Sequence, residues 1–217
     1  MKKNVMMRVA SALLVAVLMT TCAISGTFAK YTTSADAQDS ARVAKWGVTV
    51  SAAGDEAFAE KYNDAADAAG TKVVSNVSGE DVLAPGTNGT LGGITISGTT
   101  EVMVDVEVTA NLTLTGWEIA GVEYCPLVFT VGSTEIKIDG STIKTVAELE
   151  AAVEKVFTDL SKNDVAANAD LADAVSVSWR WDYSTSDEND EKDTDLAELA
   201  TAPTIAFECS VTVTQVD

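Results

Sequence analysis

The sequence predicts a mainly β fold in which two antiparallel sheets pack as a sandwich, with one amphipathic helix packed outside. Several segments alternate apolar and polar residues with period two, which is typical of strands with one buried face. Turn dipeptides that contain glycine or proline separate these segments. Only residues 145–160 show a clear helical spacing instead. Residues 44–217 are therefore expected to form one folded domain.

The first half of this domain contains most of the expected strands. Residues 44–51 alternate, with Trp46, Val48 and Val50 on one face, and valines alternate with polar residues at 102–109 in the same way. Further strands are expected at 72–77, 91–97, 112–119, 127–131 and 134–138, with turns at Pro85-Gly86 and Asn88-Gly89 and a hairpin at Gly132-Ser133. The acidic, alanine-rich residues 55–69 are expected to form one or two helical turns or an ordered loop.

The period changes at residues 145–160. The apolar residues that recur there at helical spacing are Val146, Leu149, Val153, Val156, Phe157 and Leu160. Thr145 and Glu148 have the spacing of a capping box at the start of a helix. This pattern predicts an amphipathic helix laid on the outside of the sandwich. A second short helix is expected at 163–174.

The last two strands are expected at 175–183 and 205–213. In the first, Val175, Val177, Trp179, Trp181 and Tyr183 share one face. That face is either core, or covered by a neighbouring subunit, or an exposed platform on which carbohydrate rings stack. In the second, the inward face carries Ile205, Phe207, Cys209, Val211 and Val213.

The N-terminus has the layout of a secretory signal peptide. Lys2, Lys3 and Arg8 precede an uncharged run at 9–24, and small residues follow it up to Ala29. The apolar run is short and rich in alanine and threonine, which favours cleavage over a retained anchor. The sequence thus divides into a signal peptide at 1–29, an N-terminal arm at 30–43 and the domain at 44–217.

This junction resembles a known family. The run GTFAKYT at 26–32, followed by ARVAKWGV at 41–48, is similar to the export signals of the TasA/camelysin family of Gram-positive bacteria. The similarity continues through Leu83-Ala84-Pro85-Gly86-Thr87 and into the last strand. The resemblance implies an extracellular jelly-roll protein that is cleaved by a SipW-type signal peptidase near Ala29, Lys30 and Tyr31. For fibre-forming members it also implies a filament of the biofilm matrix.

Charge and residue types exclude several classes of function. After residue 29 the chain keeps 11 basic and 33 acidic residues, a net charge of −22, which disfavours nucleic-acid binding and adsorption to anionic lipid. There is no histidine, so histidine-based triads and HExxH zinc sites are excluded. Some relatives are described as metalloproteases, and that activity is not carried over. We expect no enzyme activity and no cofactor.

Two groups of residues could form a disulfide bond or bind a metal ion. Cys125 and Cys209 could form a disulfide in an extracellular protein or pack as small hydrophobic side chains. The acidic run 187–195 could hold calcium through Asp187, Asp190, Glu191 and Asp193. Its spacing departs from that of an EF-hand, and a solvated hairpin loop is the favoured interpretation.

Two functions remain open. The first is a structural subunit or accessory component of an extracellular fibre, a head-to-tail homopolymer in which the arm adds a strand to a neighbour. The donor residues would be Tyr31, Thr32, Thr33, Ser34, Ala35 and Asp36. The alternative is a monomeric binding module or adhesin at the cell surface that uses the aromatic face of 175–183. In both cases the signal peptide is the expected membrane contact, before cleavage.

Overall fold

The structure is a computed structural model that describes residues 3–25, 41–53, 57–62, 72–182 and 187–216. It divides into two compact units, Met1–Arg42 and Val43–Asp217. The described residues contain more strand than helix, and their sheets are antiparallel. The mainly β, antiparallel prediction is therefore confirmed.

In the first unit, α1 spans Lys3–Ser25. It contains the uncharged run at 9–24 that the sequence assigns to an export signal. None of the helices within the described ranges is long and apolar enough to pass through a membrane. The predicted cleavage residues Ala29, Lys30 and Tyr31, and the whole of the predicted donor segment, lie outside the described residues.

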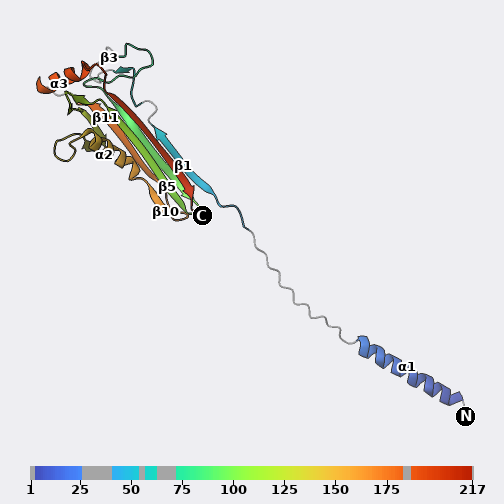
Figure 1. Cartoon of the computed structure of the whole chain (residues 1–217). Helices are drawn as coiled ribbons and strands as arrows, with labels where there is room; N and C mark the ends of the chain where they lie inside the picture. Colours follow the sequence, from blue (N-terminus) through green and yellow to red (C-terminus); the bar gives the residue numbers. More distant parts are fainter. Residues whose placement is uncertain (1–2, 26–40, 54–56, 63–71, 183–186, 217) are drawn as a thin grey trace. The chain divides into compact units, whose positions relative to one another are not determined.

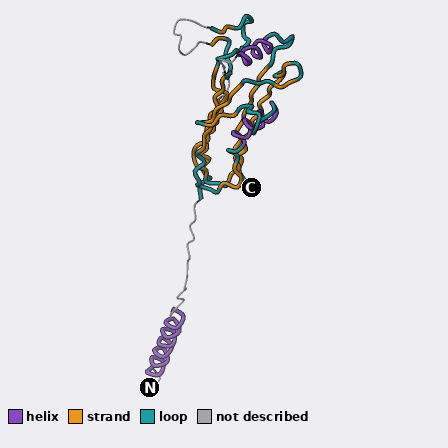
Figure 2. Tube along the Cα trace, turned by 90° about the vertical axis from the view of Figure 1, so that its left-hand side faces the viewer, coloured by secondary structure: helices purple, strands orange, loops and turns teal. Residues whose placement is uncertain are grey.

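Two sheets form the framework of the second unit and lie as two layers (Figures 1 and 2). The five-stranded sheet has the order β1-β4-β11-β8-β9 and the three-stranded sheet has the order β10-β5-β12. The strands of the first are β1 (Trp46–Ala53), β4 (Asn88–Thr100), β11 (Asp173–Trp181), β8 (Leu127–Val131) and β9 (Thr134–Ile136). Those of the second are β10 (Lys162–Val165), β5 (Val104–Thr115) and β12 (Thr204–Gln215). Two short pairs add β2 (Lys61–Tyr62) with β3 (Val73–Val74), and β6 (Glu118–Ile119) with β7 (Val122–Glu123).

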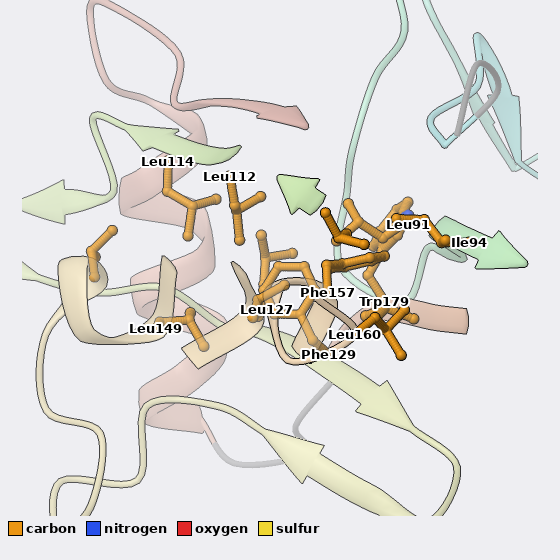
Figure 3. Close-up of a cluster of buried hydrophobic side chains, with 14 of the residues drawn as sticks. Leu91, Ile94, Leu112, Leu114, Leu127, Phe129, Leu149, Phe157, Leu160 and Trp179 are labelled. Atoms are coloured by element: carbon orange, nitrogen blue, oxygen red, sulfur yellow. The ribbon is translucent and has the colours of Figure 1, made fainter. Parts of the chain in front are cut away.

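Both sheets contribute to one hydrophobic core. In β5 the buried residues alternate with exposed ones, and Val104, Val106 and Leu112 are among the buried ones. In β11, Val177 and Trp179 are buried from the opposite layer. Figure 3 shows Leu112 and Leu114 near side chains of the helix α2, within this core. The period-two pattern therefore located the buried faces correctly.

Trp179 is a buried tryptophan of the five-stranded sheet, 2% exposed, and a loop holds it in place. Its ring lies 5.5 Å from that of Phe58 and 6.0 Å from that of Tyr62. Its indole N–H donates to the carbonyl oxygen of Ala57 at 2.9 Å. Residues 57–62 thus form an ordered loop and strand β2, without helical turns, and the rest of 55–69 lies outside the described residues.

The helix α2 (Val146–Thr158) begins as predicted and lies where the sequence did not place it. Thr145 and Glu148 form the complete capping box. On its buried face, Leu149, Val153 and Phe157 reach the core. On its flank, the carboxylate of Glu150 accepts from the backbone N–H of Leu114 at 2.6 Å, and that of Glu154 from Leu112 at 2.9 Å. The helix therefore covers the edge of β5 that β12 leaves free, rather than only the outside of a sheet.

The same edge of β5 is satisfied along most of its length. Beyond the helix, the hydroxyl of Ser161 accepts from the N–H of Val108 at 2.9 Å, and β10 pairs with Val104 and Val106. Side chains of α2, the hydroxyl of Ser161 and the short strand β10 thus together take the place of one full-length neighbouring strand. Covering an edge in this way prevents another chain from pairing with it.

Several local predictions were wrong or incomplete. Residues 163–174 form no helix, because Asp164 and Asn168 adopt φ angles of 53° and 63°, which a right-handed helix does not allow. Asn88-Gly89 lies inside β4 instead of forming a turn. The expected strands at 102–109 and 112–119 are largely one strand, β5, and the one at 72–77 is reduced to β3. The turn at Pro85-Gly86 and the β8–β9 hairpin are confirmed.

Candidate assembly interface

The β1–β12 side of the domain is open, unlike the side that α2 covers. Among the described strands, β1 pairs only with β4, and β12 pairs only with β5. The two strands lie beside each other at this side, as the blue-cyan and dark red arrows in Figure 1 show. We call the two strands together the open edge. Each has one side on which a further strand could be added.

Apolar side chains on the core-facing side of the open edge are only partly covered. Trp46 is 51% exposed and Val50 is 40% exposed, although Val50 pairs with the fully buried Ile96. On β12 the inward residues are half-buried: Ile205, Phe207, Cys209, Val211 and Val213. The three-stranded layer is narrower than the five-stranded one, so the core lacks cover at this side.

The sequence of β1 contains none of the usual devices that block an edge. Natural edge strands often carry charged side chains or proline, whereas Trp46–Ala53 reads WGVTVSAA. An added strand here would gain main-chain hydrogen bonds and would cover the exposed Trp46 and Val50. The geometry of the open edge therefore suits strand addition.

The sequence assigned Trp46, Val48 and Val50 to an inward face but could not show that they are incompletely covered. Alternation tells which side of a strand faces the core. It does not tell how many strands the opposite layer contains. To predict the poor cover, one would need the number of strands in the opposite layer. That number depends on the pairing of β5 with β12, which are distant in the sequence.

The two cysteines that the sequence offers as disulfide partners both lie in the described part of the domain. Cys125 is buried just before β8, and Cys209 is half-buried in β12 opposite Ala110. The structure does not join them to each other. Burial raises the pKa of the Cys125 thiol to about 12, so this side chain packs as a neutral, apolar group.

The described aromatic residues of β11 are not exposed to solvent. Trp179 and Trp181 are both buried, and Tyr183 lies outside the described residues. The rings of Trp181 and Trp117 lie 5.4 Å apart within the core. Trp179 and Trp181 therefore form no exposed platform along β11, and an adhesin that uses such a platform finds no support.

The acidic run forms the helix α3 (Asp187–Ala197) instead of a hairpin loop. The carboxylate of Glu188 pairs with Lys192 at 2.7 Å, one turn later, and Leu196 is buried on the inner face. An ion pair one turn apart and the buried Leu196 thus stabilise a helix that has few apolar residues. Asp190 and Glu191 are exposed whereas Asp193 is buried, and no group of metal-binding side chains is found among the described residues. The side chain of Asp187 is not described.

Asp193 anchors α3 to the sheets through one oxygen. Its Oδ1 accepts from the hydroxyl of Tyr124 at 2.8 Å and from the indole N–H of Trp181 at 3.2 Å. Burial raises the pKa of the Asp193 carboxyl above its ordinary value, although both hydrogen bonds act in the opposite direction. Burial and the neighbouring Asp193 also raise the pKa of Tyr124. The sequence placed Asp193 in a solvated loop, and this prediction was wrong because α3 turns it inward.

Replacing Asp193 with asparagine is expected to remove a pH-dependent cost to the fold. Because the folded pKa lies above the ordinary value of 3.8, the folded state holds this proton more tightly than the unfolded state. The stabilisation that the protonated Asp193 gives to the folded state is thus fully present below pH 3.8 and is lost as the pH rises through the folded pKa. Urea unfolding of both proteins over this range should show the native chain losing stability relative to D193N. A difference that stays constant with pH would contradict the assignment.

Comparison with models of known protein families and with curated proteins gives no match to this chain. The open edge and the sequence features at 26–48 are therefore the observations from which its function must be argued.

Proposed function

We propose that this chain is a secreted structural protein, a subunit or accessory component of an extracellular fibre such as that of a biofilm matrix. In this proposal the two-layer domain is a jelly roll, and the chain is a member of the TasA/camelysin type. The sequence resemblance at 26–48 supports the family. The observation that carries the function is the open edge: among the described strands β1 pairs with β4 alone and β12 with β5 alone, and Trp46 is 51% exposed.

The arm of one molecule would occupy the open edge of the next. After cleavage near Ala29, a segment of about ten residues would precede the domain and could extend about 33 Å. β1 has eight residues, so such a segment is long enough to pair along its whole length. Main-chain hydrogen bonds would supply most of the affinity, with little dependence on side-chain identity.

Repetition of this contact would generate a filament. The arm and the open edge are different surfaces of one chain, so the contact is heterologous and leaves each new end free to bind again. Before cleavage the signal peptide would hold the arm at the membrane. Removal of 1–29 by a signal peptidase would then couple assembly to export.

The proposal is tested by comparing a protein that begins at Tyr31 with one that begins at Ser40. Both are purified and imaged by negative-stain microscopy, and filaments are expected only from the longer one. A second pair separates the two faces of β1: Val50→Lys places a charge under the added strand, whereas Thr49→Lys places it on the outer face. We expect filaments from T49K and none from V50K. Equal filaments from the proteins beginning at Tyr31 and Ser40 would remove the arm from the mechanism.

A further inference from the structure

A cavity of about 680 Å³ lies at the end of the domain that carries α3. Its walls come from five parts of the chain: Phe58 in the 57–62 loop, the 80–85 segment, Trp117 after β5, the end of β11, and α3 with the connection to β12. Cavities of this volume hold small molecules or single side chains in many proteins. Of the open edge, only Thr204 and Ile205 at the start of β12 line this cavity, and the proposed strand addition does not use it.

The walls are largely aromatic and aliphatic. Phe58, Trp117 and Trp181 contribute rings, and Leu196 and Ile205 contribute aliphatic carbons. The indole N–H of Trp117 donates to the carbonyl oxygen of Thr204 at 2.9 Å, and that of Trp181 to Asp193. Both indole donors are therefore used within the protein. The rings offer the cavity carbon surface and the negative potential of their π systems.

The charged residues that line the cavity are all acidic. They are Glu80 and Asp81, which are exposed, and Asp193, which is 6% exposed. A buried carboxylate is normally paired with a cation. Among the described ion pairs none involves Asp193, and the adjacent Lys192 pairs with Glu188 instead. The two hydrogen bonds to Asp193 both go to Oδ1, so its other oxygen accepts neither of them.

We propose that this cavity binds an organic ammonium ion, a primary amine on an apolar stem. The stem packs between the aromatic rings and Leu196, and the ammonium group pairs with Asp193 and interacts with the ring faces. Like charge excludes carboxylates and phosphates, and a neutral apolar molecule leaves the buried carboxylate without a cation. The amine is supplied either by a lysine side chain of a protein or by a free alkylamine.

Binding is tested with the full chain of 217 residues at low ionic strength. The probes are n-butylamine and a peptide with blocked ends and a single lysine, and n-butanol and butyrate serve as uncharged and anionic controls. Titration calorimetry and tryptophan fluorescence should show saturable binding of an amine and no binding of the controls. Binding of the peptide without binding of n-butylamine identifies protein lysines as the source of the amine. Binding of n-butylamine shows that the cavity also takes free amines. Binding of neither amine overturns the proposal.

Two variants and a matched control locate the site. D193N keeps an acceptor for Tyr124 and Trp181 but removes the charge, and it should weaken amine binding about tenfold or more. D190N removes a charge from the exposed face of the same helix and should leave binding unchanged. Ala197 is exposed and lines the cavity, so A197W should fill the cavity from its rim and abolish binding. Thermal unfolding confirms that each variant is folded. Native affinity in both D193N and A197W would contradict the assignment.

Discussion

Replacing Trp179 with alanine should destabilise the domain by about 3–5 kcal/mol, the range found when large aromatic side chains are removed from cores. Trp179 is 2% exposed and holds residues 57–62 through Phe58, Tyr62 and the carbonyl of Ala57. Its removal leaves a cavity and also frees this loop. Urea unfolding followed by circular dichroism measures the loss. W179F keeps one aromatic ring and loses the indole donor and part of the ring volume, so it should cost less than W179A. A loss below about 1 kcal/mol for W179A would show that the loop is not held in this way.

In the protein that begins at Ser40, which lacks the arm, replacing Glu150 and Glu154 together with alanine should both destabilise the domain and make it self-associate. The change leaves the backbone N–H groups of Leu112 and Leu114 without their acceptors, and each such loss costs about 1–3 kcal/mol. The uncovered edge of β5 can then pair with another chain. Urea unfolding and sedimentation velocity measure the two effects.

Two controls separate this edge effect from a general loss of charge. E150Q/E154Q keeps an acceptor oxygen at each position and should remain close to the native protein in stability and mass. Glu107→Ala removes a charge from the exposed outer face of β5 and should leave the protein monomeric under the same conditions. Association of the E107A protein, or a monomeric E150A/E154A protein, would contradict the role assigned to α2.

Local patterns were sufficient to predict the parts of the fold that depend on neighbouring residues. The capping box of Thr145 and Glu148 and the alternation in β5 and β11 all act within a few residues. Hairpin formation at Gly132-Ser133 is of the same kind, since Val131 pairs with Thr134. In each case the residues that determine the local structure lie within that same short segment of the sequence.

Features that depend on distant residues could not be predicted in this way. Asn88-Gly89 has the composition of a turn, but Gly89 is required for another reason: a Cβ there would lie 2.9 Å from the indole nitrogen of Trp179. The acidic run gave no sign that Asp193 faces Tyr124 and Trp181, because charge runs are usually solvated. The position of α2 on an edge depends on Glu150 and Glu154 meeting β5, and no periodicity encodes that contact.

The pairing of β5 with β12 has a consequence for the order of events in folding. The hydroxyl groups of Thr109 and Ser210 meet at 2.7 Å across a sequence separation of 101 residues. Closing such a long loop costs entropy before any contact is gained, so sheets of this kind form slowly. A nascent chain cannot complete the three-stranded layer until β12 has been synthesised. The chain therefore remains without its finished tertiary structure throughout most of translation.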